Sequence, residues 1–125
     1  ALKRLQVKKV AVGAPYEDEL CTRLRRFLQD YRFSVVNLMG LGLTGSEICE
    51  QPPSVAYDLA RKVDRPEADG VFISCTGFRT AEVLQALEDD LGKPVVSANQ
   101  ALMWRSTRLS GVKSPVVGYG RLLGL

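Results

Sequence analysis

Apolar, β-branched segments alternate along this chain with segments whose apolar residues recur at helical spacing. The strand-like segments are residues 7–14, 33–39, 70–74 and 95–97, and the helical segments are residues 17–31, 53–63 (from Pro53 or Ser54), 80–91 and 100–109. Strands that are separated by helices pair in parallel through right-handed crossovers. This order predicts an α/β fold: a four-stranded, mostly parallel sheet with helices on both faces, in a compact flavodoxin-like half.

The length and composition are those of one globular domain, residues 1–125. Hydrophobic residues make up 46% of the chain and charged residues 25%, which is ordinary for a protein with a packed core. The net charge of +3 is spread along the chain without interleaved aromatic residues, so we expect no nucleic-acid partner. We expect no membrane partner either, because no apolar run approaches the roughly 20 residues of a membrane span.

The cysteine and histidine counts narrow the chemistry. The three cysteines cannot all pair, there is no C-x-x-C motif and the N-terminus is not signal-like, which together predict a reducing, cytoplasmic location. The chain contains no histidine, so we expect no metal site, and catalysis by Ser-His-Asp or Cys-His is excluded. Any catalytic acid or base must be Cys, Tyr, Asp, Glu or Lys.

The strongest chemical signal is the stretch 71–80, Val-Phe-Ile-Ser-Cys-Thr-Gly-Phe-Arg-Thr. An apolar strand ends there at Cys75, and a helical pattern follows. Ligands of open α/β sheets bind at the carboxyl ends of the strands. We expect Cys75 to lie at such an end beside a helix N-terminus, which favours a thiolate. Spacing alone leaves two interpretations open, a reactive thiol and a small buried core residue.

Other strand ends add polar groups at the same edge. Tyr16 follows the first strand, and Thr76 and Gly77 offer backbone N–H groups after the third. The fourth strand ends at Ser97, and Asn99 comes just after it. A thiol, a phenol, hydroxyls and N–H donors together suit a small carboxylate or its enediolate. Tyr16 is also compatible with an ordinary half-buried aromatic residue.

Three further features have simpler interpretations. Cys21 flanks the apolar stripe of the first helix and Cys49 falls in a turn, so both are interpreted as bystanders. The glycine-rich segment 40–46 lacks the G-x-G-x-x-G spacing and the P-loop lysine. It is interpreted as a mobile connector or as a loop that lies over the site.

A resemblance to a known family rests on five blocks in order. These are Ala-Pro-Tyr-Glu-Asp-Glu-Leu (14–20), Gly-Leu-Gly-Leu-Thr (40–44), Gly-Val-Phe-Ile-Ser-Cys-Thr-Gly-Phe-Arg-Thr (70–80), Leu-Gly-Lys-Pro-Val-Val-Ser-Ala-Asn-Gln-Ala (91–101) and Gly-Tyr-Gly-Arg-Leu-Leu (118–123). The chain resembles the second half of the Asp/Glu racemase superfamily, in the branch of maleate cis-trans isomerase and arylmalonate decarboxylase. That fold has two pseudo-symmetric halves.

The resemblance implies a function without a cofactor. It implies an isomerase, racemase or decarboxylase type of reaction on a small carboxylate or dicarboxylate, most like that of maleate isomerase. Cys75 matches the catalytic cysteine, and Tyr16 matches a tyrosine that holds a substrate carboxylate. Thr76 and Gly77 match positions whose N–H groups complete an oxyanion pocket, and Ser97 or Asn99 would support it.

Two departures from the family keep alternatives open. Cys21 stands where this branch often has asparagine, and the first half of the family fold is missing from these 125 residues. We therefore expect either a homo-oligomer or pairing with a first-half domain. The alternatives to an enzyme are a truncated, non-catalytic half that binds a carboxylate or dimerises, and a flavodoxin-like regulatory or nucleotide-binding module.

Overall fold

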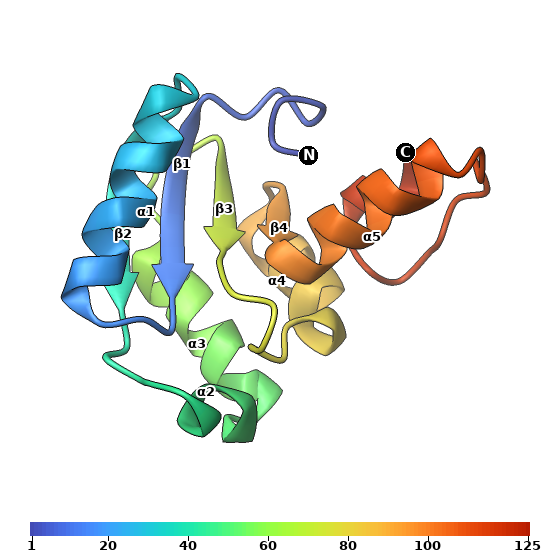
Figure 1. Cartoon of the computed structure of the whole chain (residues 1–125). Coiled ribbons are helices and arrows are strands. Elements are labelled where there is room, and N and C mark those ends of the chain that lie inside the picture. Colours follow the sequence, from blue (N-terminus) through green and yellow to red (C-terminus); the bar gives the residue numbers. More distant parts are fainter.

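A computed structural model describes residues 1–125 and shows one four-stranded sheet (Figure 1). The strands are β1 (Lys9–Ala14), β2 (Ser34–Gly40), β3 (Gly70–Ile73) and β4 (Val95–Ser97). Their order across the sheet is β2-β1-β3-β4, and every neighbouring pair is parallel. The α/β fold with a parallel sheet is therefore confirmed.

The helices follow the predicted segments closely. They are α1 (Asp18–Asp30), α2 (Ser46–Glu50), α3 (Pro53–Val63), α4 (Leu84–Leu91) and α5 (Ala98–Leu109), with short 3-10 turns η1 (Ala81–Val83) and η2 (Arg121–Gly124). None of them combines the length and the apolar character that a membrane crossing requires.

Two helix starts differ from the prediction. The helix expected from Thr80 begins as the 3-10 turn η1 and becomes an α-helix only at Leu84, so a loop separates it from Cys75. The fifth helix begins at Ala98, and its N-cap is Ser97, whose hydroxyl accepts a hydrogen bond from the Gln100 N–H at 3.2 Å. Asn99 therefore lies inside that helix.

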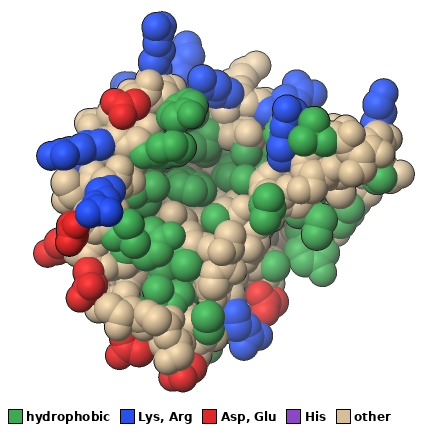
Figure 2. Space-filling view, viewed as in Figure 1, with side chains coloured by type: hydrophobic (Ala, Val, Ile, Leu, Met, Phe, Trp, Pro, Cys, Tyr) green, Lys and Arg blue, Asp and Glu red, His purple; other side chains and the backbone are tan.

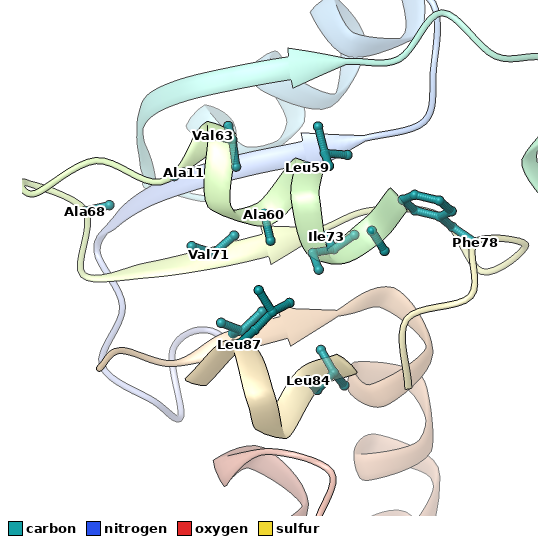
Figure 3. Close-up of a cluster of buried hydrophobic side chains, with 12 residues drawn as sticks. Ala11, Leu59, Ala60, Val63, Ala68, Val71, Ile73, Phe78, Leu84 and Leu87 are labelled. Atoms are coloured by element: carbon teal, nitrogen blue, oxygen red, sulfur yellow. The ribbon is translucent and has the colours of Figure 1, made fainter. Parts of the chain in front are cut away.

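Alternating strand residues divide the core between the two faces of the sheet. On one face α3 and α4 pack against the strands, and the buried set includes Ala11, Leu59, Ala60, Val63, Val71, Ile73, Leu84, Leu87 and Val95 (Figure 3). On the other face α1, α5 and η2 cover Val10, Val12 and Val96, together with Leu28 and Leu122. The helices therefore cover both faces, as predicted from the alternation.

The apolar stripe of α1 is narrower than the sequence suggests. Leu28 and Cys21 are buried against the sheet, whereas Leu20, Phe27 and Tyr31 remain 45%, 56% and 55% exposed. Because β2 is the edge strand, the outer row of α1 extends past the sheet and is not covered. Figure 2 shows hydrophobic side chains gathered on the face between α1 and α5. The interpretation that Cys21 only flanks the stripe is wrong, since Cys21 lies on its buried side.

A buried carboxylate joins α4 to two remote segments. Glu88 is 2% exposed, and its two oxygens accept hydrogen bonds from the backbone N–H groups of Val95 at 2.9 Å and Arg121 at 2.7 Å. Helical periodicity places Glu88 on the outer face of its helix with Asp89, and for Glu88 that placement is wrong. The carboxylate instead accepts hydrogen bonds from two backbone N–H groups.

We expect Glu88→Ala to lower the free energy of unfolding by about 2–3 kcal/mol, because it removes the acceptor of a buried N–H group at Val95 and of a part-buried one at Arg121. Denaturant unfolding measures this change. Glu88→Gln should lose less, since its amide oxygen still accepts one bond. Asp89→Ala, on the exposed face of the same helix, is the matched control and should unfold close to the wild type. An equal loss in both alanine variants would contradict this role for Glu88.

Candidate functional site

The site is built where the chain leaves β3. The Ser74 N–H donates to the Gly13 carbonyl at 2.9 Å, so pairing with β1 continues one residue beyond the strand. At Cys75 the backbone then turns sharply, with φ of +89°. This left-handed region disfavours residues with a β-carbon, and such strain gathers at functional sites. The thiol is half-buried at the carboxyl edge of the sheet.

Tyr16 reaches this position from the end of β1. Its hydroxyl is hydrogen-bonded to the Ser74 hydroxyl at 3.2 Å, and either group can donate. Burial raises the pKa of Tyr16 above its ordinary value; the Ser74 hydroxyl opposes the shift and the adjacent Cys75 thiol adds to it. The phenol therefore stays protonated at neutral pH and can donate to an anion beside Cys75.

The glycine-rich segment braces Tyr16. The N–H of Leu43 donates to the Pro15 carbonyl at 2.8 Å, and the N–H of Gly42 donates to the Tyr16 carbonyl at 3.1 Å. A β-carbon on Gly40 would lie 2.5 Å from that same carbonyl oxygen, so only glycine allows the approach. The interpretation as a mobile connector is therefore replaced by that of a hydrogen-bonded support.

The backbone after Cys75 offers free donors. The N–H groups of Thr76 and Gly77 make no hydrogen bond to any other part of the chain. The side-chain amide of Asn99 donates to the Thr76 carbonyl at 3.0 Å. In a trans peptide the next N–H points opposite to the carbonyl. Asn99 therefore orients the Gly77 N–H away from α5 and fixes it as a donor.

The remaining predicted residue has a different position. Ser97 is fully buried and uses its hydroxyl oxygen to cap α5, so it holds the start of the helix that carries Asn99. Direct contact of Ser97 with a ligand stays a prediction. Cys21 is also buried, 3.6 Å from the Tyr16 carbonyl oxygen, and burial raises the pKa of its thiol. Cys21 is thus a protonated core thiol.

The third cysteine is closer to the site than its place in a turn indicated. A β-carbon on Gly77 would lie 3.2 Å from Cys49 Sγ and 3.8 Å from Cys75 Sγ. Cys49 is carried by α2 and is exposed to solvent. The sequence offered no signal for this proximity, because α2 is too short for a periodic pattern.

Two hollows include residues of this edge in their linings. One, of about 390 Å³, is lined by Tyr16, Ile48 and residues of α1. The other, of about 410 Å³, lies between α5 and the segment 112–123 and reaches Asn99. Cys75 lines neither hollow and is half-exposed at the carboxyl edge of the sheet. A chemically productive site here needs a second wall that excludes water.

The edge thus combines a thiol with neutral hydrogen-bond donors. A thiol can transfer a proton to or from carbon, or add to a double bond. Donors that are already oriented stabilise negative charge as it develops on a carboxylate or enediolate. The expected helix N-terminus directly behind Cys75 is absent, and the donors nearest the thiol are the Tyr16 hydroxyl and the loop N–H groups.

Comparison with known proteins gives a consistent match. The family model described as arylmalonate decarboxylase matches residues 1–123. The arylmalonate decarboxylase of Bordetella bronchiseptica is 34% identical over 125 residues, which cover 97% of this chain and 52% of that protein. The maleate isomerase of Geobacillus stearothermophilus is 26% identical, over 98% of this chain and 49% of that protein. The chain spans about half the length of these relatives.

A solved structure supports the same comparison. It is a cysteine-to-serine variant of Nocardia farcinica maleate cis-trans isomerase with a covalently bound succinylcysteine intermediate. Its TM-score with this chain is 0.94 and its sequence is 25% identical, with 98% of this chain and 51% of that chain covered.

The strain at Cys75 predicts that glycine is more stabilising than alanine at this position, which reverses their usual order. Cys75→Gly and Cys75→Ala both remove the thiol, but only glycine relieves the left-handed backbone. We expect the glycine variant to have a free energy of unfolding about 1 kcal/mol above that of the alanine variant. Denaturant unfolding compares them. The control is exposed Thr76, whose φ is not positive. There the free energy of unfolding of Thr76→Ala should equal or exceed that of Thr76→Gly. Alanine above glycine at position 75 would contradict the strain.

The pKa of Tyr16 gives a second test. Its ionisation is isolated as the difference in ultraviolet absorbance between wild type and Tyr16→Phe during a pH titration. Because burial disfavours the charged phenolate, we expect this difference to appear above pH of about 10, the usual tyrosine value. The difference for Tyr31→Phe, an exposed tyrosine at the C-cap of α1, is the control. Ionisation of Tyr16 at a lower pH than Tyr31 would contradict a pKa of Tyr16 that is raised by burial.

Proposed function

The chain belongs to the arylmalonate decarboxylase family, and we propose that it carries the thiol side of a cofactor-independent site for a small dicarboxylate. The observation that supports this most is the convergence of Cys75, Tyr16 and the free Thr76 and Gly77 N–H groups at one edge. The donors would hold one carboxylate, and the thiol would act on the neighbouring carbon.

For a malonate the reaction is decarboxylation. One carboxylate leaves as CO₂, and the electron pair of the broken C–C bond delocalises into the remaining carboxylate as an enediolate. Tyr16 and the loop N–H groups stabilise that negative charge. The Cys75 thiol then gives its proton to the α-carbon, and water returns a proton to the thiolate. The 34% identity to the Bordetella decarboxylase makes this the first reaction to test.

For maleate the reaction is isomerisation by addition. The Cys75 thiolate adds to one carbon of the double bond, and the adjacent carbon forms an enediolate with its carboxylate. Rotation about the former double bond, now a single bond, precedes loss of the thiolate. The succinylcysteine intermediate of the Nocardia isomerase variant, a close structural neighbour, favours this as the second candidate. Both reactions use the same thiol and the same anion donors.

The second wall of the site is proposed to come from another domain. The chain covers about half of its relatives, and Cys75 is half-exposed at the carboxyl edge of the sheet. A first-half domain, or a second copy of this chain, would close that edge and exclude water. Without such a wall the chain would act as a small-carboxylate-binding half, which is the non-catalytic alternative.

Protection of the Cys75 thiol from alkylation tests whether a dicarboxylate binds at the site. The chain is treated with iodoacetamide with and without phenylmalonate or maleate, and alkylation of Cys75 is followed by peptide mass spectrometry. We expect either dicarboxylate to slow alkylation of Cys75 and to leave alkylation of exposed Cys49 less changed. Turnover is then assayed for the chain alone and after fusion to a first-half domain. No protection and no turnover in either form would refute the proposal.

Two substitutions test the roles of the site residues. We expect Cys75→Ser to lower kcat/KM by about 10³-fold, within the range for loss of a positioned acid. Tyr16→Phe should lower kcat/KM by about 10²-fold, because it removes one donor to the developing oxyanion. Tyr31→Phe is the matched control and should retain wild-type turnover of the active form. Retained activity in Cys75→Ser would remove the thiol from the mechanism.

A further inference from the structure

We propose that Cys49 and Cys75 form a reversible disulfide that caps the site thiol under oxidising conditions. The two cysteines come from different elements, α2 and the loop after β3. Both sulfurs lie close to Gly77, whose β-carbon position is 3.2 Å from Cys49 Sγ and 3.8 Å from Cys75 Sγ. The two sulfurs are therefore at most about 7 Å apart, the sum of those distances.

A disulfide needs an S–S distance of about 2.05 Å, so one thiol must approach the other by at most about 5 Å. The element that can move is α2. It has only five residues, none of them buried, and Ile48 is its half-buried contact with the core. Few buried contacts make local displacement of such an element inexpensive.

Formation of one Cys49–Cys75 disulfide consumes one molecule of peroxide. The exposed Cys49 thiolate attacks the peroxide oxygen, which forms a sulfenic acid and releases hydroxide, or an alkoxide from an organic peroxide. The Cys75 thiolate then attacks the Cys49 sulfur, the S–S bond forms, and the sulfenic oxygen leaves as water after protonation. The two thiols lose two electrons in total, and the peroxide gains them. A dithiol reductant restores both thiols.

The bond would have two effects at the edge. It removes the free thiol at Cys75, and it protects that sulfur from oxidation to irreversible acids. It also draws α2 across Gly77, one of the proposed anion donors. Loss of turnover on oxidation rests on the proposed function, whereas formation of the bond does not.

The bond is tested by counting thiols in the full chain. The reduced chain is treated with a small molar excess of hydrogen peroxide, quenched with catalase, denatured and alkylated with N-ethylmaleimide. Intact mass should show three adducts before oxidation and one after it, with the remaining adduct on buried Cys21. Tryptic digestion without reductant should link peptide 33–61 to peptide 63–79, and dithiothreitol should separate them.

Two variants serve as controls. Cys21→Ser should form the same linked peptides, with two adducts before oxidation and none after it. Cys49→Ser should give no linked peptide, and its Cys75 should progress to sulfinic acid at higher peroxide. Three persistent adducts in the oxidised wild type, or linkage only between two chains, would overturn the proposal. A reduced chain that lacks turnover would refute the proposed function alone and leave this result intact.

Discussion

The parallel pairing of β1 with β3 is the contact on which the site depends. Gly13 pairs with Ile73, and the Ser74 N–H extends the ladder by donating to the Gly13 carbonyl. This register places the residues that follow both strands beside each other, so the Tyr16 hydroxyl meets Ser74 next to Cys75. A slip of one residue would turn every side chain of β3 to the opposite face and separate the phenol from the thiol.

The edge of the sheet could be predicted from the sequence because parallel strands place all their carboxyl ends on one side. The alternation of segments therefore located Tyr16, Cys75 and Asn99, and the Asn99 contact with the Thr76 carbonyl confirms that β4 contributes to the same edge. Cys49 and Glu88 could not be placed. The position of Cys49 depends on the dihedral angles of glycines in the preceding loop, and the burial of Glu88 depends on donors supplied by remote segments.

The loop after β3 combines a strained residue with firm supports on both sides. Cys75 adopts a conformation that its β-carbon disfavours, while Ser74 is tied to β1 and the Thr76 carbonyl is tied to Asn99. Strain of this kind persists only where the surrounding contacts over-determine the backbone. The supports also direct the Gly77 N–H, so the same contacts that hold the thiol prepare the donors beside it.

The two hydrogen bonds of Glu88 have a consequence for cooperativity. They hold Val95 and Arg121 to one side chain, so the intervening segment, with β4 and α5, is a closed loop whose ends are joined without a covalent bond. Joining the ends of a segment restricts the conformations open to all of it. The segment should therefore open as a single unit in native-state hydrogen exchange. Asn99 would leave the Thr76 carbonyl in the same event, which couples the order of the thiol loop to the local stability of α5.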